Sequence, residues 1–328
     1  MQPRDPSQSL SPPPISDALQ RALASIDWVR LEFAHQLSDD LEVRVADGLL
    51  PFVGDVWRSA ISPFLSPQAR AALFHHTPGT GLPRLPPWCL QAPVVRGAAA
   101  PAGSVLEGAL TLFGHARPFA DACLQALASL DRLPAMGGHA RLRCIHLSAR
   151  PLSGQLLASP AKAHVNGWDA FCAAAGEPLM EAANGARVHL ESPLSLSQGA
   201  GRMTGPPSLA RLFRACLGRL QGLAPPDLPG GLYAEGEVDH WLAWADTVPL
   251  LGAELSACGQ ARHFSATQQR SYPVLGDVGH ITYGAPAALA WPWLRLAQHI
   301  QIGTNVTQGL GVIGLAPWPA QDPATAPR

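Results

Sequence analysis

The sequence predicts an α+β protein made of two tandem ferredoxin-like (RRM-like, βαββαβ) domains. Segments with the period-two pattern of strands are followed by segments whose apolar residues recur at helical spacing. These segments come in the same order in each half of the chain: strand, helix, strand material, helix, glycine-rich loop and strand. That is the order of the ferredoxin-like unit. A general α+β protein whose halves only look alike is the alternative.

The first half opens with a strand at 26–37, where Val29, Leu31 and Phe33 alternate with polar or aromatic residues. The 117–130 segment has apolar residues at helical spacing, and a glycine-bearing loop at 136–139 follows it. The expected elements of this half are a strand at 26–37, a helix at 51–61, a strand at 103–114, a helix at 117–130 and a strand at 140–147.

The second half repeats this order. Its helix at 208–223 has an apolar stripe, and Arg211, Arg214 and Arg219 are expected to lie off that stripe. Ser208 suits the N-cap. Pro292 either starts or kinks a later helix. The expected elements are a strand at 186–196, a helix at 208–223, a strand at 278–283, a helix at 287–300, a glycine-rich loop at 303–311 and a strand at 312–315.

Length and composition set the domain plan. With 328 residues and 47% hydrophobic content, the chain can bury two modest cores. We expect an N-terminal domain at 1–150 with a loose tail at 1–15, a linker at 151–184 with a short helix near 168–174, a C-terminal domain at 185–316 and a loose tail at 317–328. The Pro- and Ser-rich first residues indicate a loose tail rather than a signal peptide, and no apolar run approaches the roughly 18 residues of a membrane span, so we expect a cytoplasmic protein.

The charge is nearly balanced overall but unevenly distributed. The formal net charge is −1, yet no Asp or Glu occurs between Asp55 and Glu107 or between Glu191 and Asp227. These gaps contain arginines, which bind phosphate through a planar fork, and Lys162 is the only lysine. Basic surfaces are therefore expected on a neutral protein. The six cysteines are scattered without a C-x-x-C pair, so a metal site built on cysteine is not expected. No cofactor is expected either, because the sequence shows no cofactor fingerprint.

Five segments in order resemble one family. They are LTLFGHA at 110–116, LESPLSL at 190–196, RHFSATQQR at 262–270, GDVGHITY at 276–283 and GTNVTQGLG at 303–311. Together they resemble the RAMP superfamily and, within it, the CRISPR precursor-RNA processing endoribonucleases of the sixth Cas family. The glycine-rich loop alone would be weak support, but the order of all five segments is more specific.

The resemblance implies a role in CRISPR RNA maturation and antiviral defence. The chain would bind the repeat of the precursor transcript and cleave it without metal by attack of a 2′-hydroxyl on the adjacent phosphate, and it could stay bound to the crRNA. Its partners would be repeat RNA or crRNA and other Cas proteins of an interference complex, with no membrane. The alternative is a non-catalytic RAMP subunit that only holds guide RNA. A metabolic enzyme is a third class, for which no cofactor fingerprint or nucleophile motif is found.

Cleavage of this kind needs a base, an acid and positive charge on the phosphoryl oxygens. Histidine has a pKa suited to both proton transfers near neutral pH. His35, at the end of the opening strand, His75 and His76 are therefore the candidates for acid and base, and Arg58 would neutralise a phosphate. Ser59 follows Arg58 where the family often carries glycine, which puts that match in doubt. Each residue could instead be an ordinary surface or core residue.

Three groups are candidates for RNA binding. In the glycine-rich loop, three glycines allow positive φ and close backbone approach, and polar side chains add hydrogen-bonding groups; the alternative is a tight turn that binds nothing. An acid-free stretch suits a grip on an RNA stem. Arginines of the 208–223 helix offer a further basic face, or a merely solvated one. The residues are Gly303, Thr304, Asn305, Gln308, Gly309 and Gly311; Arg262, Ser265, Gln268 and Arg270; and Arg211 and Arg214.

Overall fold

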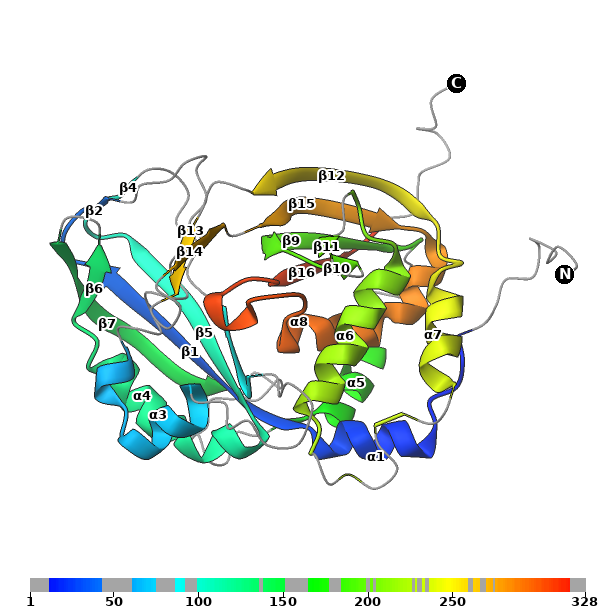
Figure 1. Cartoon of the computed structure of the whole chain (residues 1–328), viewed down its shortest axis with the longest axis horizontal. Helices are drawn as coiled ribbons and strands as arrows, with labels where there is room; N and C mark the ends of the chain where they lie inside the picture. Colours follow the sequence, from blue (N-terminus) through cyan, green and yellow to red (C-terminus); the bar gives the residue numbers. More distant parts are fainter. Residues whose placement is uncertain are drawn as a thin grey trace, which may run out of the picture.

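Two antiparallel sheets, with helices packed beside them, form the two halves of the computed structural model (Figure 1). The structure describes residues 12–42, 61–74, 86–91, 99–135, 138–150, 165–176, 184–198, 201–202, 205–225, 228, 232–233, 236–258, 262–265, 270–273 and 275–318. Among the described helices, none combines the length and the apolar character needed to cross a bilayer.

The N-terminal sheet has the strand order β3-β5-β1-β7-β6. β1 (Asp27–Leu37) is central and pairs antiparallel with β5 (Val105–Phe113) and β7 (Gly138–Arg150), while β3 (Trp88–Gln91) pairs with β5 and β6 (Arg132–Ala135) with β7. The four main strands of this half are, in chain order, β1, β3, β5 and β7. When they are numbered 1 to 4 in that order, they lie side by side in the sheet as 2-3-1-4. This arrangement is the ferredoxin-like sheet.

Helices and minor strands complete this half. The helical segments are η1 (Ser62–Phe64), α3 (Pro67–Phe74), η2 (Gly114–Phe119) and α4 (Ala120–Ala128). The minor strands are β2 (Leu41–Glu42), β4 (Ala99–Ala100) and β8 (Val165–Asn166). α4 buries Cys123, Ala126 and Leu127 toward the sheet, as the helical spacing at 117–130 predicts.

The C-terminal sheet repeats the same topology. Its order is β12-β15-β9-β16, with all pairs antiparallel. The strands are β9 (Ala186–Leu194), β12 (Leu250–Cys258), β15 (Gly276–Tyr283) and β16 (Ile313–Pro317), and the helical segments are α6 (Leu209–Leu223), α7 (Glu237–Ala245), η5 (Ala285–Ala290), α8 (Trp291–Ile300) and η6 (Val306–Gln308). Two short hairpins are added: β10 (Ser197–Gln198) with β11 (Gly201–Arg202), and β13 (Arg262–Ser265) with β14 (Arg270–Pro273). The predicted pair of ferredoxin-like domains is confirmed.

Two separate clusters of buried apolar side chains form the cores. The C-terminal cluster also takes in α1 (Asp17–Ser25) and α5 (Gly167–Ala175). α1 buries Leu19, Ala22 and Leu23 there, and its N-cap Ser16 donates its hydroxyl to Glu237 Oε2 at 3.0 Å. The first helix of the described residues therefore packs against the C-terminal half before β1 enters the N-terminal sheet (Figure 1).

Several elements were not expected from the sequence. β3, β6, β12, α1, α3 and α7 have no counterpart among the predicted elements, whereas the strands at 26–37, 103–114, 186–196 and 278–283 and the helix at 208–223 are confirmed with shifted ends. Pro292 lies in the first turn of α8 and starts the helix without kinking it. The helix predicted at 51–61 lies outside the described residues except for its last position.

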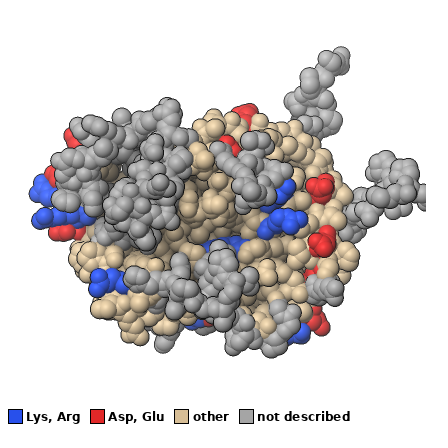
Figure 2. Space-filling view, in the orientation of Figure 1, with Lys and Arg blue, Asp and Glu red and all other residues tan. Residues whose placement is uncertain are grey.

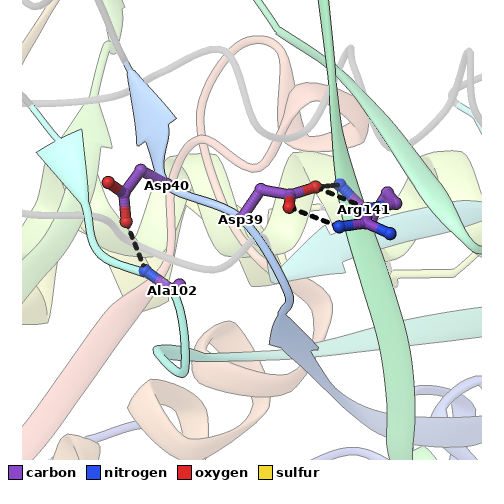
Figure 3. Close-up of polar contacts among 4 residues, drawn as sticks. All are labelled: Asp39, Asp40, Ala102 and Arg141. Atoms are coloured by element: carbon purple, nitrogen blue, oxygen red, sulfur yellow. Dashed lines mark hydrogen bonds and ion pairs between the residues drawn. The ribbon is translucent and has the colours of Figure 1, made fainter.

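Two adjacent acids hold the turn after β1 (Figure 3). Asp39 accepts two hydrogen bonds of 2.8 Å from the Arg141 guanidinium on β7, and Asp40 accepts one of 2.8 Å from the Ala102 N–H. The hydrogen bonds from Arg141 lower the pKa of Asp39 to about 2. This exposed turn is thus fastened to the neighbouring strand and to the segment that leads into β5.

Candidate functional site

The glycine-rich loop joins α8 to β16 and follows a left-handed path. Gly303, Gly309 and Gly311 have φ of 91°, 84° and 74°, and Asn305 has φ of 60°. The positive φ predicted for the three glycines is confirmed. At Gly311 a Cβ would lie 1.8 Å from the Ile302 carbonyl oxygen, so the chain can pass there only as glycine.

Backbone hydrogen bonds fasten the loop to the end of β9 and the residue after it. The Gly311 N–H donates to the Pro193 carbonyl at 3.1 Å, and the Thr304 N–H donates to the Ser195 carbonyl at 3.1 Å. Gly309 and Gly311 are buried, whereas residues 303–305 are exposed. The expectation that Gly309 and Gly311 meet RNA is therefore corrected: they close the loop against the core, and residues 303–305 form its accessible edge.

The accessible edge of the loop faces arginines of α6 across a cavity of about 470 Å³. The loop contributes residues 303–307, and α6 contributes Arg211, half-buried, and Arg214, exposed. Figure 2 shows Lys and Arg atoms on this face in the area where Figure 1 places α6. The described lining residues, none of which is acidic, are Pro86, Ser195, Leu196, Arg211, Arg214, Ala215, Arg219, Gly303, Thr304, Asn305, Val306 and Thr307. The structure thus brings together two groups of residues that the sequence predicted separately.

The chemistry of this cavity suits an anion. Arg211 and Arg214 present guanidinium groups, which remain protonated and match phosphate oxygens through two parallel donors. Thr304, Asn305 and Thr307 add neutral polar side chains. η6 also packs against β3 of the N-terminal sheet, so the loop lies where the two domains meet.

Arg219 has a different environment from the other two arginines of α6. Its side chain is buried, with 4% exposure, and it donates to the carbonyls of Ile300, Pro86 and Trp88 at 3.3, 3.2 and 3.2 Å. Burial lowers the pKa of its guanidinium. Arg219 was expected to lie off the apolar stripe, and this is wrong. Because it comes three residues after Cys216 and seven after Leu212, helical spacing puts it on the stripe, a signal that its charge obscured.

His35 does not reach an exposed sheet edge. Its side chain has 0% exposure, its Nε2 lies 2.9 Å from the Leu127 carbonyl oxygen, and burial lowers its pKa. Its place on β1 has the same parity as Val29, Leu31 and Phe33, so the pleat directs the ring toward α4. The expectation that β1 delivers His35 to the RNA is corrected. Arg58, His75 and His76 lie outside the described residues.

The third predicted group forms the β13–β14 hairpin. Arg262 and Ser265 are the first and last residues of β13, and Arg270, which begins β14, pairs in register with Ser265. Gln268 lies outside the described residues. In the view of Figure 1 the hairpin appears between the labelled N-terminal and C-terminal sheets. Gln308, in η6, belongs to the loop.

A second cavity, of about 570 Å³, was not anticipated. It is lined by Asn184, Arg187, Leu251, Gly252, Ala253, Glu254, His280, Thr282 and Trp318. The Arg187 guanidinium lies over the Trp318 ring, 4.1 Å from its centroid, and the rings of His189 and His280 are 5.9 Å apart. Burial is the largest cause that lowers the pKa of His189, and the nearby charges of His280 and Arg187 lower it further. Because Glu254 lies on its wall, this cavity suits an anion less well than the loop cavity.

Comparison with known proteins gives a match over the C-terminal domain. Residues 188–313, which include β9, α6, α8 and the glycine-rich loop, match the family model of the CRISPR-associated endoribonuclease Cas6. The resemblance to the Cas6 family is confirmed. No curated protein sequence matches the chain.

Cas6 structures share the fold of nearly the whole chain. A Cas6 (TTHB231) product complex is 16% identical, with a TM-score of 0.55 over 88% of this chain and 100% of that one. A Cas6 (TTHA0078) product complex is 14% identical, with a TM-score of 0.51 over 88% and 99%. The same comparison finds Thermus thermophilus Cas6 (TTHB231) at 15% identity, with a TM-score of 0.53 over 89% and 100%. At these identities the likeness establishes the two-domain Cas6 fold.

Proposed function

We propose that this protein binds the repeat of a CRISPR precursor transcript and cleaves it without metal, by attack of a 2′-hydroxyl on the scissile phosphate. The observation that carries the proposal is the loop cavity, where residues 303–307 meet Arg211 and Arg214 across a lining without acids among its described residues. The family match and the product complexes of the similar Cas6 structures support the same function.

The cavity would hold phosphates of the RNA chain. Its two guanidinium groups supply positive charge, and the polar side chains and backbone of residues 303–305 supply neutral contacts. Contacts of this kind fix the position of an RNA strand without reading its bases. We assign the β13–β14 hairpin, with Arg262 and Arg270, to the grip on the repeat stem, and His75, His76 and Arg58 to the cleavage step.

The alternative is a RAMP subunit that holds guide RNA without cutting it. The burial of His35 favours this alternative, because it removes the leading histidine from contact with RNA. Both functions require the loop cavity, and only the endoribonuclease requires an acid and a base.

Incubation with labelled repeat RNA in EDTA tests the proposal. The endoribonuclease yields a 5′ fragment that ends in a cyclic phosphate, and an RNA with a 2′-deoxy nucleotide at the cleavage position stays intact. Tight binding without cleavage under all conditions would establish the scaffold instead. Cleavage that requires added Mg²⁺ would refute the metal-independent mechanism. His75→Ala and His76→Ala, alone and combined, identify the acid and base, with His139→Ala as a matched histidine control.

A further inference from the structure

Arg219 joins the two domains directly behind the loop cavity. It belongs to α6 of the C-terminal domain, and its Nε donates to the Ile300 carbonyl at the end of α8, 3.3 Å away. Its Nη1 and Nη2 cross to the N-terminal domain, where they donate to the carbonyls of Pro86 and Trp88, each at 3.2 Å. The guanidinium also lies 5.7 Å from the centroid of the Phe113 ring on β5. One side chain therefore links α6, α8, β3 and β5.

This set of contacts depends on the shape of guanidinium. Its three nitrogens point in fixed directions in one plane, and each has a different carbonyl partner. A lysine ammonium is a single point on a flexible stem and cannot occupy three such positions at once. Replacement by lysine would keep the charge and lose the link between the domains.

The charge of Arg219 is also unusual. Within the described residues, no carboxylate accepts a hydrogen bond from it. Its partners are backbone carbonyls and the thiol of Cys89, whose pKa is raised by burial. A buried cation without a counter-charge carries a desolvation cost that carbonyl dipoles offset only in part. The same side chain lines the loop cavity beside Arg211 and Arg214. An anion in that cavity would supply the missing counter-charge.

We propose that Arg219 is a positioning residue, which holds the two domains in the one orientation that forms the loop cavity, and that an RNA phosphate in the cavity stabilises this orientation in return. The inference rests on the proposed function, because it takes RNA as the anion. Coupling between two events is reciprocal, so domain docking strengthens phosphate binding by the same factor by which phosphate strengthens docking.

Binding of labelled repeat RNA to Arg219→Lys, measured by fluorescence anisotropy over a range of salt concentrations, tests the inference. We expect the dissociation constant to rise at least 10-fold and the slope of log K against log salt to become smaller, because this substitution keeps the positive charge but moves Arg211 and Arg214 away from the phosphates. Arg211→Met should reduce the slope by about 0.7 to 0.9, as expected for one lost phosphate contact. Arg295→Lys, on α8 and outside the described lining of the cavity, is the matched control and should bind like the original protein.

A double variant separates positioning from general destabilisation. If Arg219 holds the cavity in shape, Arg211→Met should weaken binding less in the Arg219→Lys background than alone, at temperatures where every variant is folded by circular dichroism. Unchanged binding in Arg219→Lys, or single effects that simply multiply in the double variant, would overturn the inference.

If the Arg219 variants do not fold, hydrogen exchange of the unmodified protein tests whether RNA binding stabilises the contact between the domains. Repeat RNA should slow exchange by at least threefold in β3, which lies across the domain boundary from α6. RNA that binds without protecting β3 refutes the role of Arg219 and leaves the proposed function intact. Failure to bind repeat RNA in preference to an unrelated RNA refutes the proposed function itself.

Discussion

Replacing Gly311 by alanine should destabilise the protein through the glycine-rich loop. Gly311 has φ of 74°, and its missing Cβ would lie 1.8 Å from the Ile302 carbonyl oxygen. A non-glycine residue in the left-handed region costs about 1–2 kcal/mol. Relief of the contact must also displace residue 302, whose N–H donates to the Gly311 carbonyl at 3.2 Å, a hydrogen bond worth about 1 kcal/mol. The expected loss in free energy of unfolding is therefore roughly 2–3 kcal/mol.

Urea unfolding followed by circular dichroism measures this loss. Gly218→Ala is a matched control, because Gly218 lies within α6 and a Cβ there would have no atom within 4 Å apart from the adjacent backbone of its own helix. Alanine should stabilise that helix by about 0.5–1 kcal/mol. If Gly311→Ala costs less than about 1 kcal/mol while the control behaves as expected, the loop does not depend on its left-handed closure, and the reasoning is wrong.

Two histidines give further predictions. His35→Ala should lower the free energy of unfolding by roughly 2–4 kcal/mol, because it leaves a cavity at a buried site. The rate of cleavage per folded molecule should stay unchanged. A 100-fold loss of cleavage in folded protein would show instead that His35 is a catalytic residue. Burial, Arg30 and Arg295 lower the pKa of His299 to about 3. Because the unfolded state then binds the proton first, stability should fall as pH drops from about 6.5 toward 3, by at most ~1.4 kcal/mol per pH unit. Urea unfolding of His299→Gln should show a smaller pH slope, and an identical slope would contradict the assignment.

The sequence predicted those elements whose local pattern matches their tertiary setting. β1 alternates because one of its faces packs on helices, and α6 shows a stripe because one side of it is buried. β12 was missed because it is an edge strand, with none of its nine residues buried and no strict alternation. The packing of α1 against the C-terminal half depends on contacts distant in sequence, which no local pattern reveals.

The candidate site was predicted in parts and not as a whole. The sequence identified the loop from its glycines and the basic face from Arg211 and Arg214, but only the fold shows that the two share one cavity. His35 was expected at the sheet edge because it lies near the end of its strand, and Arg219 was expected off the apolar stripe of its helix. Their spacing already matched the buried faces of β1 and α6, so in both cases periodicity was the better guide.

The salt dependence of repeat-RNA binding tests the central claim most directly, namely that the loop cavity is where this protein holds RNA phosphates. Each phosphate contact contributes about 0.7 to 0.9 to the slope of log K against log salt. The combined Arg211→Met and Arg214→Met variant should therefore bind more weakly, with a slope reduced by about 1.4 to 1.8, while Arg295→Met keeps the original slope. An unchanged slope in the double variant would show that the phosphates lie elsewhere.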